Sequence, residues 1–277
     1  MTADLYCVMG NPVEHSRSPW IHARFAQLTG QDVHYGKRLV PLGGFQQAVR
    51  DFRAEGGRGC NVTVPFKFEA APLATQLTAR AALAGACNTL RFDGAGILAD
   101  NTDGVGLAND IAHNAGIDIG GRDVLLIGAG GAASGVLGPL LEARPRRIVV
   151  ANRTCAKAGL LAERHGALAA RNGVRLEAPE LRDLRDAFDV VINATTTSLS
   201  GAAVPVPAAV LKPGALACDM MYGPAAQGFL AWASRHGAVA RDGLGMLVEQ
   251  AAEAFFVWRG VRPPSAQVLA ELRTTLQ

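Results

Sequence analysis

The stretch DVLLIGAGGAAS, residues 123–134, decides the fold of this chain. The five residues DVLLI suit a buried strand, and they run directly into a glycine-rich turn and then into small residues that suit a helix. The turn matches the G-x-G-x-x-A form of the dinucleotide fingerprint. In that pattern Gly128 permits the tight turn, Gly130 lets the backbone approach a pyrophosphate, and Ala133 lets the helix pack close to the sheet. Amides at the start of the helix would then bind the phosphates.

The residues after the next expected strand, RRIVVANR at 146–153, indicate which nucleotide binds. An NAD enzyme places Asp or Glu there to bind the ribose 2′-hydroxyl. This chain has Asn152, Arg153 and Thr154, with Lys157 one turn later. Arg and Lys attract a 2′-phosphate, and Asn and Thr can hydrogen-bond to it. A solvated basic helix start is the alternative, although cations are disfavoured at a helix N-terminus unless an anion lies there. The sequence therefore favours NADP over NAD.

Strands and helices alternate on both sides of this turn, which predicts an α/β protein built from parallel βαβ units. Strands are expected at 6–10, 34–40, 59–65, 123–128, 146–153, 189–195, 215–222 and 238–243. Helices are expected from Ser18, at 44–55, after Pro65, at 104–115, after the glycine turn, and at 242–260. We divide the chain into a substrate-binding and catalytic domain, residues 1–103, completed by C-terminal helices in 244–277, and a Rossmann-like NADP-binding domain with a parallel sheet, residues 104–243.

Composition excludes several classes of protein. Hydrophobic residues make up 49% and charged residues 18% of the 277 residues, which excludes an intrinsically disordered chain. The net charge of +3 comes from scattered basic residues, which argues against a nucleic-acid partner. Five separated cysteines and histidines without ligand spacing argue against disulfides and a metal site. The uncharged stretch 124–141 holds five glycines and a proline, so we expect no membrane span there. The N-terminal MTADLYCVMGNP has neither the basic start nor the long apolar stretch of a signal peptide, so we expect none. We expect a cytoplasmic protein.

Two pairs of polar residues in the N-terminal third admit a structural and a ligand-binding interpretation. Ser16 and Ser18 stand in a turn before a proline-started helix. We expect Ser18 or its neighbour to cap that helix, which leaves the other hydroxyl for a ligand. Strand alternation places Asn61 and Thr63 on one face, with their valine neighbours on the other. This pair either satisfies its hydrogen bonds internally or lines a cleft.

Lys67 and Asp103 are candidates for proton chemistry. Lys67 follows Pro65 in the first turn of a helix, where the helix dipole disfavours an ammonium and should lower its pKa. A lysine of that kind can exchange protons near neutral pH, although an ordinary surface lysine is the alternative. Asp103 stands just before the expected helix 104–115, so it is either a helix cap or a functional carboxylate.

Two amides complete the set of candidates. Asn88, in GACNTL at 85–90, suits a turn. Gln250 shares a helical face with Met246, so we expect its amide to be buried and to need a hydrogen-bond partner.

Taken together, these segments resemble the shikimate dehydrogenase family over nearly the whole chain. Nine motifs stand in the family's order: GNPVEHSRSPWIH, NVTVPFK, AGACNTL, DNTDGVG, GAGGAAS, NRT, NAT, DMMY and GLGMLVEQAAEAF. The resemblance implies two α/β domains with the active site in the cleft between them. It implies reversible, NADP-linked reduction of 3-dehydroshikimate to shikimate, a step of the pathway to chorismate and the aromatic amino acids.

The resemblance also implies roles for particular residues. Lys67 would pass a proton to or from the reacting oxygen, and Asp103 would bind the adjacent hydroxyl and orient the lysine. The substrate-binding residues it implies are Ser16, Ser18, Asn61, Thr63, Asn88, Tyr222 and Gln250. The cofactor-binding residues it implies are Gly128, Gly130, Gly131, Ala132, Asn152, Arg153, Thr154, Lys157, Gly243 and Met246.

The chain departs from the family pattern at Cys87, at Cys218 and in YGPAAQGFL, residues 222–230. Two other functions fit the same motifs. One is a quinate/shikimate dehydrogenase that accepts more substrates and uses NAD, and the other is a non-catalytic, nucleotide-sensing relative. We expect a monomer or a homodimer that works on a small molecule.

Overall fold

The computed structural model of the protein describes residues 3–195 and 204–276. The chain divides into two compact units. Unit 1 comprises Met1–Gly106 and Val248–Gln277, and unit 2 comprises Leu107–Leu247. The sequence-based boundaries lie after residues 103 and 243, within a few residues of this geometric division. We keep them as a proposal for the functional domains.

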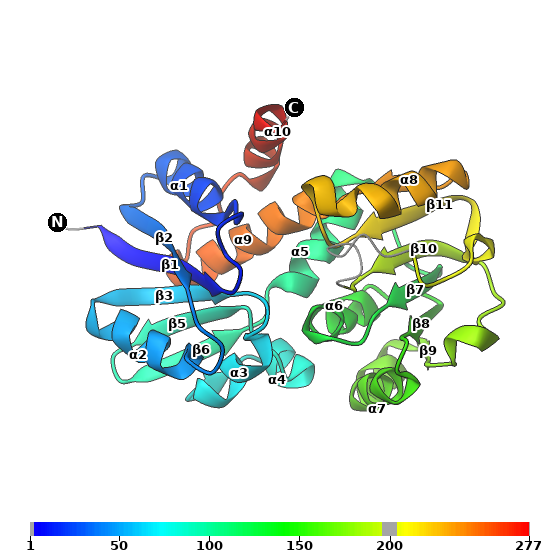
Figure 1. Ribbon diagram of the computed structural model, residues 1–277, viewed down its shortest axis with the longest axis horizontal. Helices are drawn as coiled ribbons and strands as arrows, with labels where there is room; N and C mark the ends of the chain where they lie inside the picture. The colour runs from blue at the N-terminus through cyan, green and yellow to red at the C-terminus, as the bar shows by residue number, and fades with distance from the viewer. Residues whose placement is uncertain (1–2, 196–203, 277) are drawn as a thin grey trace. The chain divides into compact units, whose positions relative to one another are not determined.

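Unit 1 contains a mixed six-stranded sheet in the order β2-β1-β3-β5-β6-β4 (Figure 1). Its strands are β1 (Asp4–Gly10), β2 (Val33–Leu39), β3 (Gly57–Val62), β4 (Gln76–Leu77), β5 (Thr89–Asp93) and β6 (Gly96–Asp100). β1 lies parallel to β2 and β3, as the βαβ pattern predicts. β5 lies antiparallel to both β3 and β6, so a purely parallel arrangement is wrong for this unit. The hairpin turns at Gly94, whose φ of 53° suits glycine.

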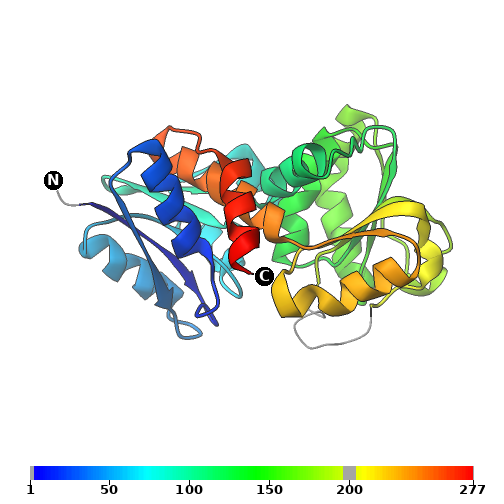
Figure 2. The ribbon, with the colours of Figure 1, turned by 90° about the horizontal axis from the view of Figure 1, so that it is seen from above.

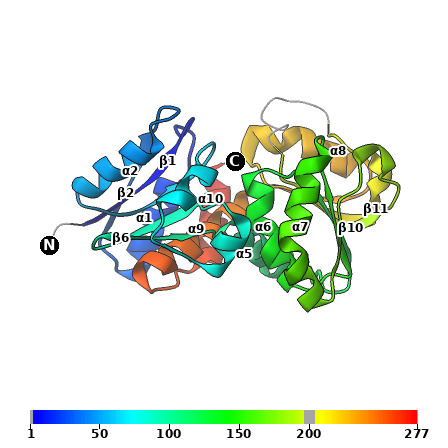
Figure 3. The same ribbon diagram turned by 90° about the horizontal axis from the view of Figure 1, so that it is seen from below.

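The helices of unit 1 cover both faces of this sheet. Figures 1 and 2 show α1 (Ser18–Thr29), α9 (Leu244–Arg259) and α10 (Ser265–Thr275) on one face. Figure 3 shows α2 (Phe45–Ala54) on the other, where α3 (Lys67–Ala70) and α4 (Ala79–Ala84) also lie in Figure 1. The core between α2 and the sheet is built from aromatic and small apolar side chains, including Phe45, Phe66 and Leu90.

Unit 2 contains a parallel six-stranded sheet in the order β12-β11-β10-β7-β8-β9. The strands are β7 (Asp123–Ile127), β8 (Arg147–Ala151), β9 (Arg175–Glu177), β10 (Phe188–Asn193), β11 (Leu211–Asp219) and β12 (Val239–Arg241). From β7 the chain adds β8 and β9 on one side, and from β10 it adds β11 and β12 on the other. The strand order therefore reverses between β7 and β10, beside the glycine turn, and open α/β sheets bind ligands at such a point. The expected Rossmann-like parallel sheet is confirmed.

Helices cover both faces of this sheet. Figure 1 shows α6 (Gly131–Glu142) and α7 (Cys155–Asn172) on one face and α8 (Gln227–Arg235) on the other. The expected helix 104–115 is α5 (Asp103–Asn109), which continues into a π-helical turn, Asp110–Asn114. Within the described residues, no helix is both long and apolar enough to cross a membrane.

Two local expectations are wrong. Ser18 is the first residue of α1 rather than its N-cap, and the N-cap position falls on Arg17. The hydroxyl of Ser16 instead accepts a hydrogen bond from the Ser18 amide at 3.3 Å. The strand expected at 59–65 ends at Val62, so strand alternation does not extend to Val64, whose side chain is exposed.

Candidate functional site

Lys67 and Asp103 form an ion pair at one edge of the unit 1 sheet. Lys67 follows β3, and Asp103 follows β6 as the first residue of α5. Because β5 is antiparallel to both strands, β3 and β6 run in the same direction and their carboxyl ends share an edge. Lys67 Nζ donates to Asp103 Oδ2, and only 15% and 6% of the two side chains are exposed. The surface-lysine alternative is therefore wrong for Lys67.

Asn88 lies at the centre of this site, because it precedes β5 and so reaches the same edge. Its side chain is buried. Asn88 Nδ2 donates to Asp103 Oδ1 at 2.9 Å, to Thr102 Oγ1 at 2.9 Å and to Gln250 Oε1 at 3.2 Å. Its Oδ1 accepts the Thr102 amide at 2.8 Å. Asn88 is therefore more than a turn residue, since its amide joins Asp103 to α9.

Gln250 is half-buried rather than fully buried, and its amide has the hydrogen-bond partner that its helical position predicts. Its Oε1 accepts from Asn88 Nδ2 and lies 3.4 Å from Thr102 Oγ1. Gly106 allows this approach, because a Cβ there would lie 2.6 Å from Gln250 Cβ. The expectation that this amide needs a partner is confirmed.

Asn61 satisfies its hydrogen bonds within the chain. Its Oδ1 accepts from Tyr35 Oη at 2.7 Å, and its Nδ2 donates to Thr89 Oγ1 at 3.1 Å and to the Asn88 carbonyl at 3.2 Å. Thr63 is half-buried beyond the end of β3, where its amide donates to the Met9 carbonyl. Of the two interpretations, internal satisfaction therefore holds for Asn61.

The remaining expected substrate residues lie apart from these in the sequence. Ser16 is half-buried before α1, and Ser18 is buried at its start. Tyr222, in unit 2, is half-buried and stands at the N-cap of the 3₁₀ turn Gly223–Ala226. The departing segment 222–230 thus forms this turn and the start of α8.

The glycine turn of unit 2 has open backbone at the start of an uncapped helix. Gly128 has a φ of 117°, and a Cβ there would lie 3.0 Å from the Ala194 carbonyl oxygen. A Cβ on Gly130 would meet nothing within 4 Å, so the backbone faces open space. Helix α6 begins at Gly131 without a side-chain cap, and Ala132 is half-buried in its first turn. Ala133 is fully buried, as close packing of α6 on the sheet requires.

The residues expected to select the nucleotide lie at the start of α7. Asn152 Nδ2 donates to the Thr154 carbonyl at 2.9 Å, which shapes the turn, and Thr154 is the N-cap residue. The side chains of Arg153 and Lys157 are exposed, and among the residues that the structure describes neither side chain makes a hydrogen bond or ion pair. Two cations therefore stand unneutralised at a helix N-terminus, which is where a phosphate would bind.

Gly243 and Met246 occupy a tightly packed segment of unit 2. A Cβ on Gly243 would lie 2.4 Å from the Met220 carbonyl oxygen, and Met246 is buried. No local pattern in the sequence marks the ion pair of Arg241 and Asp110 against this segment. Arg241 binds Asp110 through two hydrogen bonds, at 2.9 and 2.6 Å, and a Cβ on Gly245 would lie 1.8 Å from Asp110 Oδ1.

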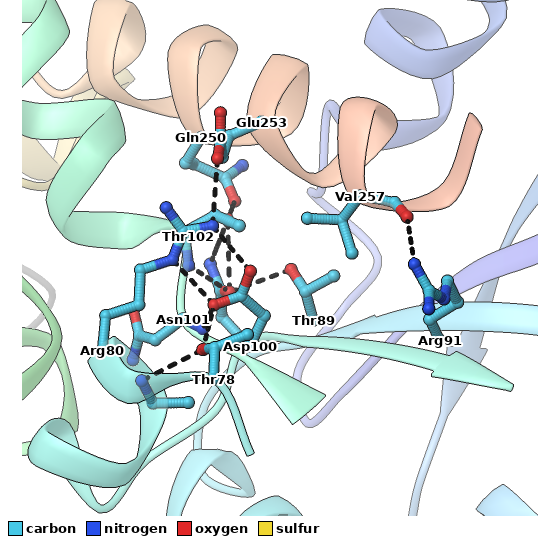
Figure 4. A network of polar contacts seen from close by, with 12 residues as sticks. Thr78, Arg80, Thr89, Arg91, Asp100, Asn101, Thr102, Gln250, Glu253 and Val257 are labelled. Carbon is cyan, nitrogen blue, oxygen red and sulfur yellow. Dashed lines mark hydrogen bonds and ion pairs between the residues drawn. The ribbon is translucent and has the colours of Figure 1, made fainter. Parts of the chain in front are cut away.

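A second polar cluster in unit 1 is not predicted from the sequence, although Asp100, Asn101 and Thr102 stand inside the DNTDGVG motif (Figure 4). Arg80 binds the buried carboxylate of Asp100 through two hydrogen bonds and also reaches Glu253. Burial favours the neutral acid, but Arg80 and the Thr78 hydroxyl together hold the pKa of Asp100 below its usual value. Among the described residues, no three His, Cys, Asp or Glu side chains are grouped as a metal site.

Comparison with known proteins places these features in a family. Residues 8–90 match the model of the shikimate dehydrogenase substrate binding domain, 108–200 that of shikimate / quinate 5-dehydrogenase, and 243–273 that of the shikimate 5′-dehydrogenase C-terminal domain. A shikimate dehydrogenase (NADP(+)) of Acidovorax sp. (strain JS42) is 68% identical over 99% of this chain and 97% of its own.

Two solved structures extend the comparison. An Ael1 enzyme from Pseudomonas putida is 45% identical, with a TM-score of 0.88 over 98% of both chains. The shikimate 5-dehydrogenase of Thermus thermophilus, solved with NADP(H) and shikimate, is 30% identical, with a TM-score of 0.82 over 99% of this chain and 100% of its own. The resemblance expected from the nine motifs is confirmed.

Proposed function

Because this chain belongs to the shikimate dehydrogenase family, we propose that it catalyses the reversible, NADP-linked reduction of 3-dehydroshikimate to shikimate. The observation that carries this proposal is the shielded ion pair of Lys67 and Asp103, set among amide and hydroxyl groups in unit 1. A reaction that moves a hydride to a ring carbon leaves the oxygen on that carbon in need of a proton. We assign Lys67 to supply this proton.

Each member of the pair has a distinct task. Lys67 Nζ gives the proton to the carbonyl oxygen during reduction and takes it back during oxidation. Asp103 Oδ2 accepts from Lys67 Nζ and so aims the ammonium, while Asp103 Oδ1 is held by Asn88. The fixed carboxylate pre-positions the lysine, which is how a site lowers the entropic cost of reaction.

The substrate is a ring that carries a carboxylate and several hydroxyls, and the polar residues suit it. We assign Ser16 and Ser18 to the carboxylate, and Thr63, Asn88 and Gln250 to the ring hydroxyls, with Asn61 and Tyr222 in support. Buried polar groups left unpaired by a wrong ligand are costly, so such a set discriminates among polyols.

The glycine turn and the start of α7 fit a phosphorylated dinucleotide. The open backbone at Gly130 and the uncapped amides of α6 suit the pyrophosphate, and we include Gly128, Gly131 and Ala132 in that turn. Arg153 and Lys157, with Asn152 and Thr154, suit the 2′-phosphate. Gly243 and Met246 are assigned to the nicotinamide. When bound, this cofactor supplies or accepts the hydride.

Turnover by the purified protein tests the proposal. Mixing it with shikimate and NADP should raise absorbance at the reduced-nicotinamide band. Lys67→Ala should lower kcat by about 10²–10⁴, the usual contribution of general acid–base catalysis, and leave NADPH affinity unchanged. Lys212→Ala, at the opposite edge of the unit 2 sheet from its glycine turn, is the control and should keep full activity. Unchanged turnover in Lys67→Ala would overturn the assignment, and no turnover by the wild type would favour the nucleotide-sensing alternative.

Substrate and cofactor choice separate the narrower function from the broader one. We propose a preference for shikimate over quinate and for NADP over NAD, since no carboxylate stands at the position of Asn152. Values of kcat/KM for both polyols with both cofactors measure it, and comparable values for quinate with NAD would identify a quinate/shikimate dehydrogenase. We further propose that the enzyme works in the cytoplasm, because its five unbridged cysteines suit a reducing compartment. We also propose that it works as a monomer or homodimer.

A further inference from the structure

A largely buried ionic cluster joins the end of β6, three residues before Asp103, to α9, which carries Gln250. Arg80, in α4, donates from Nε to Asp100 Oδ1 at 2.7 Å and from Nη2 to Asp100 Oδ2 at 2.6 Å. The same Nη2 donates to Glu253 Oε1 at 3.0 Å. Asp100 ends β6, and Glu253 stands in α9 (Figure 4). Only 2% of Asp100 and 7% of Glu253 is exposed. One guanidinium therefore ties the end of a strand to a helix.

The strand side of this tie leads to the catalytic carboxylate. Asp100 Oδ1 accepts the Asn101 amide at 2.7 Å, and Asn101 Oδ1 accepts the Asp103 amide at 3.2 Å. Asn101 Nδ2 donates to the Ala86 carbonyl at 2.8 Å, which fixes the loop beside Asn88. Arg80 thus holds Asp100, the last residue of β6, and a loop of two residues leads from there to Asp103, the first residue of α5.

The helix side leads to the amide that contacts Asn88. Gln250 and Glu253 are three residues apart in α9, so their side chains project from the same face of the helix. Figure 4 shows both pointing toward the loop that Asp100 begins. A shift of α9 at Glu253 would therefore move Gln250 Oε1 away from Asn88 Nδ2.

We propose that Arg80 is a positioning residue, which clamps Asp100 to Glu253. The clamp keeps Asp103 Oδ1 and Gln250 Oε1 within hydrogen-bond distance of Asn88 Nδ2. This inference rests on the proposed function of that site. The side-chain partners of Arg80 among the described residues are Asp100 and Glu253 rather than Lys67 or Asp103, so it acts through the loop and through α9. Lysine cannot replace it fully, because a single ammonium cannot grip one carboxylate at two points while reaching a second.

Other contacts hold α9 in place when this clamp is removed. Arg91 Nη1 donates to the Val257 carbonyl at 3.1 Å, and Trp258 Nε1 donates to the Leu90 carbonyl at 3.0 Å. Glu253 keeps Arg262 at 2.8 Å, and Asp100 keeps the Thr78 hydroxyl at 2.6 Å. Loss of Arg80 should therefore loosen the middle of the helix, up to Glu253, without unfolding the unit.

The test compares Arg80→Met with Arg91→Met, which removes the tie to Val257, four residues after Glu253 in the same helix. For Arg80→Met we expect kcat/KM for shikimate to fall by about 10- to 100-fold, the effect of a misplaced reacting geometry, with changes in both kcat and KM. The dissociation constant of NADPH should stay at the wild-type value. Arg80→Lys should recover part of the loss, and Arg91→Met should keep wild-type kcat and KM. A purely structural clamp would lower the melting temperature of Arg80→Met and leave kcat and KM unchanged, which would overturn the proposal.

A second readout does not depend on the reaction. Hydrogen exchange of the α9 amides around 248–253 should speed up in Arg80→Met and stay at the wild-type rate in Arg91→Met. Wild-type protein without shikimate turnover would refute the proposed function, whereas unchanged exchange in Arg80→Met would refute the clamp. If Arg80→Met does not fold, Glu253→Met removes only the helix side of the clamp, and unchanged kcat, KM and exchange in that variant would equally overturn it.

Discussion

At the scale of single residues, His22 has an unusual position. It is fully buried, it stacks on Tyr35 with ring centroids 4.2 Å apart, and neither ring nitrogen makes a hydrogen bond of ordinary geometry with a described residue. Burial, opposed in part by the nearby Asn61 side chain, lowers the pKa of His22 to about 3. The imidazole is therefore neutral in the folded protein at pH values where the unfolded chain already binds a proton.

This neutral histidine should make stability depend on pH. Between about pH 6.5 and pH 3 the unfolded state binds one more proton at His22 than the folded state. The stability that the neutral imidazole contributes is therefore fully present above pH 6.5 and is lost as the pH falls. We expect the free energy of unfolding to fall by about 1.4 kcal/mol per pH unit relative to His22→Phe. Urea unfolding of both proteins at pH 5, 6 and 7 measures this difference, and parallel curves would contradict it.

The cysteines give a second prediction at this scale. Burial raises the pKa of Cys7, Cys87 and Cys218 to about 12 and that of Cys60 well above its usual value. The thiolate is the reactive form, so these four thiols should be inert near neutral pH. A chromogenic disulfide reagent should label at most Cys155 in the native protein and all five cysteines in denaturant. Rapid labelling of a second native thiol would disprove the expected protection.

At the scale of secondary-structure elements, the start of α9 depends on a glycine. A Cβ on Gly245 would lie 1.8 Å from Asp110 Oδ1, and Asp110 is held by two hydrogen bonds from Arg241. Gly245→Ala should therefore destabilise the protein by about 1–3 kcal/mol or more, because a fixed buried side chain blocks the added methyl. Gly228→Ala in α8 is the control, since a Cβ there meets nothing within 4 Å, and it should be neutral or slightly stabilising. Equal melting temperatures for the two variants would contradict this account of the segment.

The start of α7 makes a prediction about the cofactor. Arg153→Ala should raise the KM for NADPH and leave activity with NADH unchanged, because only the phosphorylated cofactor carries the group that the guanidinium would bind. Arg171→Ala, in the last turn of the same helix, is exposed and serves as the matched control. An equal loss with both cofactors would contradict the 2′-phosphate assignment.

Elements with strong local signals are predictable from the sequence, and those that depend on distant partners are not. DVLLI followed by glycines specifies β7 and the turn before α6, because a continuous apolar run and a positive φ at Gly128 are both local requirements. The hairpin of β5 and β6 is absent from the sequence-based prediction, although Asp93-Gly94 is a hairpin signal. The expectation that Ser18 caps α1 is wrong because the helix already includes that residue, one position earlier than the pattern suggests.

The site shows the same division. Lys67, Asn88 and Asp103 stand out by residue type, but their meeting at one edge follows from an antiparallel β5 that the sequence pattern does not predict. Arg80 and Glu253 are 173 positions apart in the chain, so neither residue carries a local sign of the other. Their pairing depends on how α9 docks, which is a property of the packed unit.

At the scale of the whole molecule, each unit contains a buried carboxylate that is held by cations. Arg80 and Thr78 lower the pKa of Asp100 in unit 1 against the effect of its burial, and hydrogen bonds from Arg146, with Lys212, lower that of Asp123 in unit 2. A lowered carboxylate pKa contributes stability above the ordinary value of 3.8, and this stability is lost as the pH falls through the folded-state pKa. We expect both units to lose stability steeply below about pH 4. Fluorescence-monitored acid titration should show a shallower transition in Asp123→Asn, and an unchanged one would contradict the assignment.

The division of unit 1 into two distant stretches of chain affects how the protein is made. Lys67 and Asp103 leave the ribosome early, but Glu253, Val257 and Trp258 emerge only after the whole of unit 2 has been synthesised. Until α9 is synthesised, the surfaces of β5 and Arg80 that it covers in the folded protein are exposed in the nascent chain, and unit 1 is incomplete. Unit 2 is continuous in sequence, so it can complete its own sheet first. The proposed catalytic site of unit 1 is therefore assembled late in synthesis, after α9 has emerged.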